Sequence, residues 1–371
     1  MDLRCPRKAK LYAWISVCQR STPAVGLLQS PVKLRWTDMN DDTFPCFLVT
    51  RDGEQVTQAV TTISLADLPP GDVIIDVQYS SLNFKDALAA TGHPGVVRHF
   101  PHVPGIDCAG IVAATDVGGL NVGQPVIVTG YEFGAERWGG WSGRVRVPAE
   151  WVVPLPAELT LHEAMIYGTA GFTAAQSVAA LQHHGVTPEA GEIVVTGATG
   201  GVGSVAVSLL SHLGYRVAAV SGKSQSHDRL REMGAARILG RDEVDDQSDR
   251  PVLKAAWAGA IDTVGGNILA TLLRTTQQRG CVTACGLVAG AELPMTVYPF
   301  ILRGVTLQGI DSAACPMQPR LEIWHKLAGP WKPNGLNRLA QEVTFAQLAE
   351  SVQQMLSGQV VGRTVVVPAT D

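Results

Sequence analysis

The sequence predicts an α/β protein built from a β-rich domain and a doubly wound parallel sheet. Three observations predict this fold class. Short strand-like segments punctuated by glycine and proline fill the first part of the chain, helical and strand patterns alternate in the second part, and a glycine-rich turn joins a strand to a helix at residues 194–206. At 371 residues the chain exceeds the usual size of one core, so we expect two domains.

Residues 1–45 are predicted to be an N-terminal extension outside the fold. Residues 1–38 hold seven Lys and Arg against two acidic residues and show no sustained periodicity. This composition is typical of an organelle transit peptide, and it also arises when a start codon is assigned upstream of a true start at Met39. We favour the second interpretation. A secretory signal is disfavoured, because the apolar stretch 11–17 is short and interrupted by polar residues.

The β-rich domain is predicted over residues 46–162 and 305–371, with the nucleotide-binding domain over 163–304 between its two parts. Strands of the first domain are expected at 47–50, 73–79, 111–114, 126–129 and 143–147, and a terminal strand at 362–368 is expected to rejoin it. The second domain is expected to contain a helix at 164–180 and strands at 193–196, 215–220, 260–263 and 280–285. The substrate cleft should lie between the two domains.

The glycine-rich turn predicts a dinucleotide site. Gly197, Gly200, Gly201 and Gly203 let the backbone turn tightly and approach a pyrophosphate, and the helix beginning near Val202 directs its free N–H groups at the phosphates. The spacing departs from the simple G-x-G-x-x-G form. The strand before the turn, the helix after it and the next strand at 215–220 nevertheless complete a βαβ unit.

The residues after that next strand predict NADP(H) rather than NAD(H). Ser221 stands where an Asp or Glu would bind a ribose 2′-hydroxyl, and Gly222 and Lys223 follow it. A hydroxyl and a lysine can receive a 2′-phosphate, and Arg229 and Arg237 lie close in sequence. The alternative is that Lys223 and Arg229 are solvated surface residues.

Composition narrows the function classes. Without residues 1–38 the chain carries a net charge of −9, which argues against nucleic-acid binding as the main role. Its apolar runs are too short to span a membrane. Seven cysteines scattered through the chain favour reduced thiols in a cytoplasmic protein over a disulfide framework.

Several motifs together resemble the medium-chain dehydrogenase/reductase superfamily, and within it the zinc-free acrylyl-CoA reductase or quinone oxidoreductase-like branch. The resemblance covers about residues 46–368 and rests on SSLNFKDALAATG (80–92), FPHVPGIDCAG (100–110), WGGWSGRVRVPAEWVVPLP (138–156), GTAGFTA (168–174), SGK (221–223) and PFILRGVTLQGIDS (299–312). It implies a GroES-like domain, a Rossmann domain and bound NADPH. The cofactor contacts that it implies are Phe84, Thr199, Gly200, Gly201, Val202, Ser221, Gly222, Lys223, Arg237, Leu287, Ile301 and Ser312.

The chain departs from the zinc alcohol dehydrogenases of that superfamily where they bind their catalytic metal. Asn83–Asp86 replaces the segment with a zinc-binding cysteine, and Pro104–Asp107 replaces Gly-His-Glu. The four closely spaced cysteines of a structural zinc lobe are missing as well. Cys281 and Cys285 have no partner pair, and the loop histidines lack the spacing of metal ligands, so we predict no metal.

A site without zinc is better suited to an acceptor that is already electron-poor, such as an α,β-unsaturated thioester. We predict Asn83, Lys85 and Asp86 as catalytic, with the Asn83 amide donating to the developing enolate oxygen and Lys85 stabilising charge or anchoring Asp86. Phe84 can only pack against the nicotinamide, so the proton donor is expected to be solvent or another residue. The alternative is structural, with Asp86 capping a helix that starts at Ala87.

Arg303 is predicted to bind a CoA phosphate, with a helix C-terminal cap as the equal alternative. The sequence is compatible with three functions. The first is NADPH-dependent reduction of acrylyl-CoA or another short enoyl-CoA, the second is NADPH:quinone reduction, and the third is a non-catalytic NADPH-binding role. The resemblance also implies a homodimer that pairs strands near residues 280–286.

Overall fold

Residues 43–369 are described by the computed structural model of this protein. Most of the predicted extension, residues 1–42, lies outside the described residues, as does the Met39 start. Thr43–Pro45, which we assigned to the extension, instead begin strand β1 (Thr43–Asp52). This strand pairs antiparallel with β2 (Gln55–Ser64) in a two-stranded sheet.

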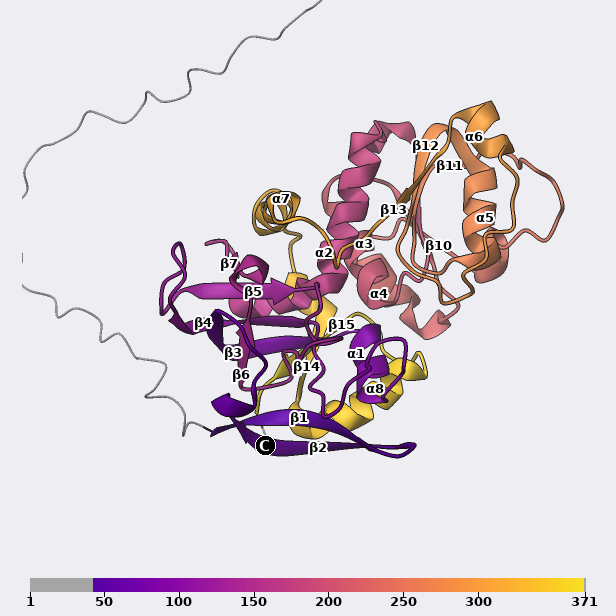
Figure 1. The fold of residues 1–371 in the computed structure, drawn as a ribbon. Helices are drawn as coiled ribbons and strands as arrows, with labels where there is room; N and C mark the ends of the chain where they lie inside the picture. The colour runs from indigo at the N-terminus through magenta and orange to yellow at the C-terminus, as the bar shows by residue number, and fades with distance from the viewer. Residues whose placement is uncertain (1–42, 370–371) are drawn as a thin grey trace, which may run out of the picture. The chain divides into compact units, whose positions relative to one another are not determined.

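The β-rich domain is organised around a seven-stranded sheet. Its strand order is β14-β15-β3-β4-β5-β7, with β6 paired to β3. The bounds are β3 Val73–Leu82, β4 Asp107–Thr115, β5 Pro125–Thr129, β6 Arg144–Val147, β7 Val153–Pro154, β14 Ala340–Thr344 and β15 Arg363–Val367. Helices α1 (Phe84–Ala90) and α8 (Leu348–Leu356) contact each other and pack into one apolar core with β15. Figure 1 shows the yellow C-terminal elements lying among the indigo and purple strands, so the end of the chain returns to the first domain.

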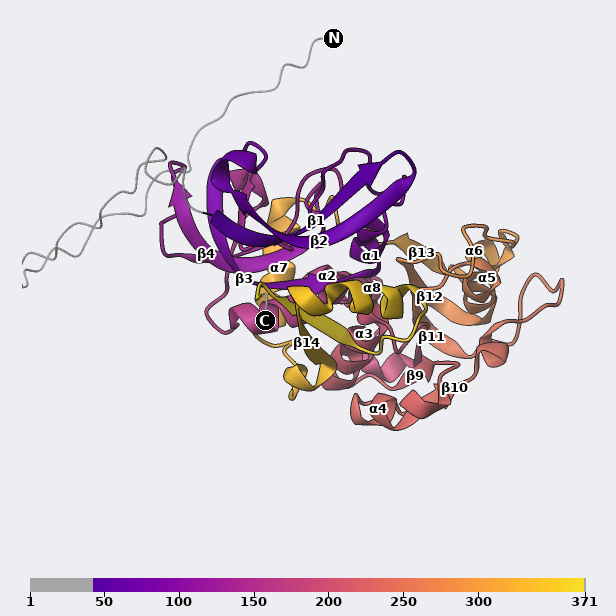
Figure 2. The same ribbon diagram turned by 90° about the horizontal axis from the view of Figure 1, so that it is seen from below.

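The second domain has a six-stranded parallel sheet in the order β10-β9-β8-β11-β12-β13. Its strands are β8 Ile193–Val195, β9 Val217–Val220, β10 Arg237–Leu239, β11 Trp257–Asp262, β12 Thr276–Ala284 and β13 Thr306–Gly309, and the associated helices are α2 Leu161–His183, α3 Gly201–His212, α4 His227–Glu232, α5 Gly266–Thr275, α6 Tyr298–Arg303 and α7 Met317–Ala328. Figure 2 shows α3 and the strands of this sheet from a second side. The sheet extends past residue 304, where we predicted its domain to end, because β13 pairs with β12.

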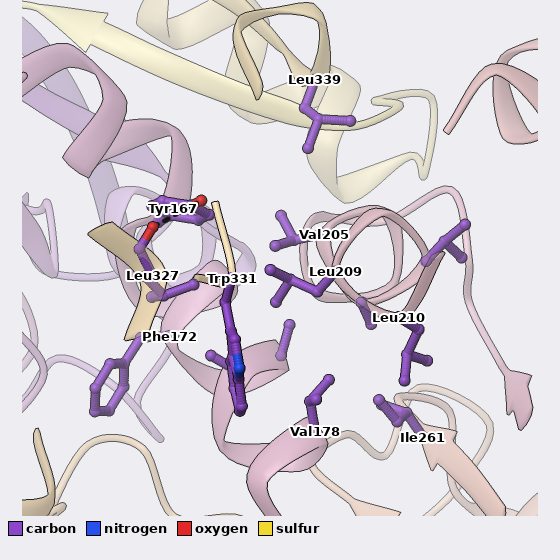
Figure 3. Close-up of a cluster of buried hydrophobic side chains, with 14 of the residues drawn as sticks. Tyr167, Phe172, Val178, Val205, Leu209, Leu210, Ile261, Leu327, Trp331 and Leu339 are labelled. Carbon is purple, nitrogen blue, oxygen red and sulfur yellow. Dashed lines mark hydrogen bonds between the residues drawn. The ribbon is translucent and has the colours of Figure 1, made fainter. Parts of the chain in front are cut away.

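The largest core joins α2 and α3 to the parallel sheet. Figure 3 shows Tyr167 and Phe172 of α2, Leu209 of α3 and Ile261 of β11 in one buried cluster, together with Trp331 beyond α7. Burying side chains of this size stabilises a fold by roughly 1.5–3 kcal/mol each. This core fixes α3, and therefore the glycine-rich turn at its start, against the sheet.

Helix α2 changes direction at Gly168, whose backbone is non-helical (φ 48°, ψ −156°). The next residue begins the second part of the helix, and its N–H donates to the Asp107 carboxylate from β4 (2.9 Å). A carboxylate at a helix N-terminus is favourable, because it accepts from a free N–H group and complements the helix dipole. The bend therefore joins the helix of the second domain to the sheet of the first.

Candidate active site

The glycine-rich turn lies at the carboxyl end of β8, where the strand order reverses towards β11. Helix α3 begins at Gly201 without a side-chain cap, which leaves the N–H groups of its first turn to a ligand. At two positions of the turn only glycine fits, because a Cβ atom would collide with neighbouring groups. A Cβ on Gly203 would lie 2.3 Å from the Gly197 carbonyl oxygen, and a Cβ on Gly197, whose φ is +55°, would lie 2.3 Å from Thr263 Oγ1. Close packing and uncapped N–H groups fit a pyrophosphate at this position.

Two cations and a hydroxyl group lie at the carboxyl ends of the next strands. The Ser221 hydroxyl, directly after β9, accepts from the Lys223 N–H (3.0 Å). A Cβ on Gly222 would lie 3.1 Å from Arg241 Nε, which places the Arg241 side chain against this loop. Burial, and then the neighbouring Arg241, lower the pKa of Lys223. Among residues 43–369 no carboxylate pairs with Lys223, so two like charges share a site that suits a 2′-phosphate.

Arg241 was not among the cofactor residues predicted from the sequence. The signal for it was its position, because it follows β10 by two residues and parallel strands place the residues after them at one edge of the sheet. Arg237, at the start of the same strand, lies at the opposite, amino edge. There it pairs with Glu192 (3.1 Å) and lies over the Trp257 ring (5.2 Å). Arg241 is therefore the better-placed arginine, and a cofactor contact by Arg237 would require it to leave Glu192.

Asn83 and Asp86 form the start of helix α1. Asn83 is the N-cap, and its backbone N–H donates to Asp86 Oδ2 (2.8 Å) in a capping box. The other Asp86 oxygen accepts from the Gly105 and Ile106 N–H groups (3.2 and 2.7 Å). Asp86 is fully buried, and burial, followed by the charge of Asp107, raises its pKa to about 7 against the effect of these donors. The structural alternative therefore describes Asp86, although the helix starts at Phe84 rather than Ala87.

The Asn83 side chain is already engaged with protein groups at both ends. Its Nδ2 donates to Asp107 Oδ2 (2.8 Å) and Asp86 Oδ2 (2.9 Å), and its Oδ1 accepts from Arg363 Nη1 (3.1 Å). These partners fix which end of the amide is nitrogen. Both N–H groups point at carboxylates in this structure, and the predicted donation from Asn83 to a substrate oxygen, which would require them to leave these partners, stays a prediction.

Asp107 and Arg363 complete this buried network, and the sequence analysis assigned a role to neither. Asp107 accepts from Ser81 Oγ (2.6 Å), Asn83 Nδ2 (2.8 Å) and both the backbone N–H and hydroxyl of Thr169 (2.9 and 2.5 Å). Arg363, 2% exposed, donates through Nε to the Ile166 carbonyl (2.8 Å), while its Nη2 has no partner in the described part of the chain. Burial lowers the pKa of Arg363, and Asp107 and Asp86 oppose that shift.

Phe84 and Lys85 differ from their neighbours because both are exposed. Phe84 is 50% exposed, so one face of its ring is free to contact a ligand. Lys85 makes no hydrogen bond or ion pair with another residue in the range 43–369, and it does not anchor Asp86. Of the four residues Asn83–Asp86, the outer pair is therefore structural in its contacts, and the middle pair faces solvent.

The remaining predicted cofactor residues lie after the last two strands or on α6. Leu287, beyond β12, and Ile301 on α6 are 67% and 72% exposed. Ser312, beyond β13, accepts from Thr173 Oγ1 (2.8 Å), and Thr199 in the turn accepts from the Gly362 N–H through its carbonyl (2.9 Å). Their cofactor contacts stay predictions.

Arg303 does not reach a substrate site. Its Nη1 donates to the carbonyls of Arg274 and Thr276 (both 3.0 Å), and its Nη2 donates to the Leu253 carbonyl. Thr276 is the first residue of β12, so the guanidinium lies at the amino edge of the sheet, opposite the glycine-rich turn. These contacts tie α6 to the end of α5, as the alternative of a helix C-terminal cap implies, and they do not support the predicted CoA contact. Arg229 similarly donates to the Leu339 carbonyl (3.3 Å) rather than to the phosphate-site residues.

No group of three or more His, Cys, Asp or Glu side chains that could hold a metal ion occurs within residues 43–369. Cys281 is buried in β12, and Cys285 donates from its thiol to the Asp262 carbonyl (3.4 Å). His102 is buried beside the Gly134 carbonyl (3.2 Å), and burial lowers its pKa to about 4. A search of the same residues finds no helix long and apolar enough to cross a membrane.

Two family models match this architecture, an alcohol dehydrogenase GroES-like domain over residues 69–157 and a zinc-binding dehydrogenase over residues 201–323. Acrylyl-CoA reductase AcuI of Ruegeria pomeroyi is 45% identical over 325 residues, which cover 87% of this chain and 98% of that protein. This chain belongs to the medium-chain dehydrogenase/reductase superfamily. Its seven-stranded sheet belongs to the GroES-like domain and its six-stranded sheet to the Rossmann domain of that superfamily, as the motifs predicted.

Solved structures of this superfamily agree with the fold. The yhdH oxidoreductase from Salmonella enterica, crystallised with NADP, is 47% identical, with a TM-score of 0.85 over 87% of this chain and 99% of that chain. The Bacillus subtilis protein yhfP, crystallised with NAD, is 43% identical, with a TM-score of 0.86 over 88% of this chain and 100% of that chain.

Proposed function

We propose that this medium-chain reductase uses NADPH to reduce the C=C bond of acrylyl-CoA, or another short enoyl-CoA, to the saturated thioester. The cofactor choice rests on the group formed by Ser221, Lys223 and Arg241, which has two cations and no carboxylate paired with them among residues 43–369. The similarity to the AcuI protein over nearly its whole length supports the substrate class.

Bound NADPH would supply the hydride. The N–H groups at the start of α3 would hold its pyrophosphate, and the exposed ring of Phe84 would pack against the nicotinamide. Lys85, exposed beside Phe84, is the cation of α1 that can approach the thioester oxygen or a CoA phosphate. Asn83 and Asp86 act indirectly, because their capping box fixes the start of α1 and so the directions of Phe84 and Lys85.

The proton that reaches the α-carbon comes from outside the buried network. Asp86 and Asp107 each accept four hydrogen bonds from N–H and O–H groups, so these bonds favour the ionised carboxylates. Within residues 43–369 neither carboxylate has an acceptor arranged for a proton of its own. Solvent entering beside Lys85 is the donor that we propose.

We also propose that the protein is a homodimer in the cytoplasm. Strand β13 is at the edge of the Rossmann sheet, and exposed apolar side chains lie on the segments beside it. These side chains are Leu287, Val288, Val297, Ile301 and Leu302. An edge strand next to exposed apolar groups favours pairing with a second copy. Light scattering after size exclusion distinguishes a dimer from a monomer.

The test is NADPH oxidation by the full chain, followed at 340 nm, with acrylyl-CoA, crotonyl-CoA and a benzoquinone. Turnover of acrylyl-CoA with NADPH, and much weaker turnover with NADH, is the expected result. Turnover confined to the quinone would overturn the thioester assignment and leave the cofactor assignment intact. NADPH binding without turnover of any acceptor would indicate the non-catalytic role.

A further inference from the structure

Residues 360–363, which we call the C-terminal strap, connect the loop after α8 to strand β15. The strap contacts the predicted cofactor site at three positions, two in the Rossmann domain and one in the GroES-like domain. Each position belongs to a different part of the predicted cofactor site: the 2′-phosphate loop, the glycine-rich turn and the start of α1. Three of these four residues, Val360, Gly362 and Arg363, therefore contact parts of the site that lie far apart in the sequence, and Arg363 is 280 residues from its partner Asn83.

The first contact joins the strap to the 2′-phosphate loop. Lys223 Nζ donates to the Val360 carbonyl (3.1 Å), and the side chain is partly buried beside Arg241. A carbonyl is a neutral acceptor, so it satisfies one N–H of the ammonium without neutralising its charge. An ammonium has three donors, and Lys223 can therefore hold Val360 and a phosphate oxygen together.

The second contact joins the strap to the glycine-rich turn. The Gly362 N–H donates to the Thr199 carbonyl (2.9 Å). Gly362 has a φ of +81°, and a Cβ there would lie 2.4 Å from the Leu339 carbonyl oxygen and 3.0 Å from Arg229 Nη2. Only glycine fits this close approach, so the path of the strap over the turn is tightly defined.

The third contact joins the strap to helix α1. Arg363 Nη1 donates to Asn83 Oδ1 (3.1 Å) and lies 3.0 Å from where a Cβ on Gly201 would be. Asn83 is the N-cap of α1, and Phe84 follows it. The guanidinium therefore connects the start of α3 to the helix that carries the predicted nicotinamide contact.

We propose that Lys223 is a positioning residue as well as a phosphate ligand: through Val360 it holds the strap, and through Arg363 the strap holds the start of α1. This inference rests on the proposed function for its kinetic consequence, although its structural part does not. A 2′-phosphate bound to Lys223 would strengthen the anchor of the strap. NADPH would then differ from NADH in kcat as well as in KM.

The variant Lys223→Met separates the two roles, because it keeps the aliphatic stem and removes the donors. NADH has no 2′-phosphate, so a residue that only binds phosphate is silent when NADH is the cofactor. We expect Lys223→Met to lower kcat with NADH, and Lys223→Arg to restore much of it. The exposed Lys254 provides the matched control, since Lys254→Met removes the same charge from the same domain.

Hydrogen exchange of the Gly362 amide tests the anchor without turnover. We expect exchange in the cofactor-free Lys223→Met protein to be about tenfold faster than in the wild type, as the loss of one hydrogen bond to a charged group implies. Arg241→Met should raise the KM for NADPH and leave Gly362 exchange at the wild-type rate. Wild-type exchange in Lys223→Met would overturn the inference. If no acceptor is turned over by any variant, the proposed function fails and the exchange rates still decide this inference.

Discussion

Replacing Asp86 by asparagine tests the buried network on which the start of α1 depends. The carboxylate accepts four N–H bonds, two from Asn83 and one each from Gly105 and Ile106. An asparagine side chain offers one oxygen, so its NH₂ group must face two of these four donors. At roughly 1.5–3 kcal/mol for each hydrogen bond to a charged group, the loss is about 3–6 kcal/mol. Removing the burial cost that raises the Asp86 pKa offsets part of it, and we expect about 3 kcal/mol.

Urea unfolding, followed by tryptophan fluorescence, measures this loss as a lower midpoint at an unchanged slope. The exposed Asp52→Asn change is the control and should leave the midpoint in place. Activity should fall with stability, because Phe84 and Lys85 depend on the same capping box. An Asp86→Asn protein as stable as the wild type would refute the argument that these four bonds hold α1.

Three further predictions concern single side chains. Burial lowers the pKa of His102 to about 4, so between pH 6.5 and pH 4 the unfolded chain binds a proton at this residue and the folded protein does not. The free energy of unfolding should therefore fall by about 3 kcal/mol as the pH drops from 6.5 to 4. The variant His102→Gln should flatten this part of the plot of unfolding free energy against pH. Gly203→Ala should abolish cofactor binding in a fluorescence titration and lower the thermal midpoint, since its Cβ would lie 2.3 Å from the Gly197 oxygen. Arg303→Met should lower the thermal midpoint of unfolding and leave the KM for acyl-CoA unchanged, because the three acceptors of Arg303 are backbone carbonyls of its own domain. A higher KM with an unchanged midpoint would instead support binding of the substrate by Arg303.

Features encoded by neighbouring residues could be predicted from the sequence. The turn at Gly197–Gly203, the strand before it and the helix after it are contiguous, so apolar runs and glycine spacing were sufficient. The same holds for the terminal strand, found at Arg363–Val367 within the predicted 362–368. Strand β13 was missed as part of the Rossmann sheet, because no local pattern tells which of two sheets a short strand will join.

Charged residues were harder to assign, because proximity in sequence does not show which edge of a sheet a side chain faces. Arg237 begins the three-residue strand β10 and Arg241 follows it, and only Arg241 lies at the edge with the glycine-rich turn. Arg303 was predicted to be near the cleft from its motif, and its guanidinium bonds three carbonyls at the amino edge instead. Arg363 had no local signal at all, since its partner Asn83 is 280 residues away.

The polar groups of the buried network are committed to one another, which bears on the proposed reaction. Asn83 donates to Asp107 and accepts from the permanently charged Arg363, so the Asn83 amide links the Asp107 carboxylate to the buried guanidinium. Arg363 is buried and committed to Asn83 and the Ile166 carbonyl, so it holds positive charge in place but does not move a proton. The carboxylates are likewise saturated with donors. In the proposed function, the thioester itself and exposed groups such as Lys85 would therefore polarise the acceptor, as expected of a conjugate reduction.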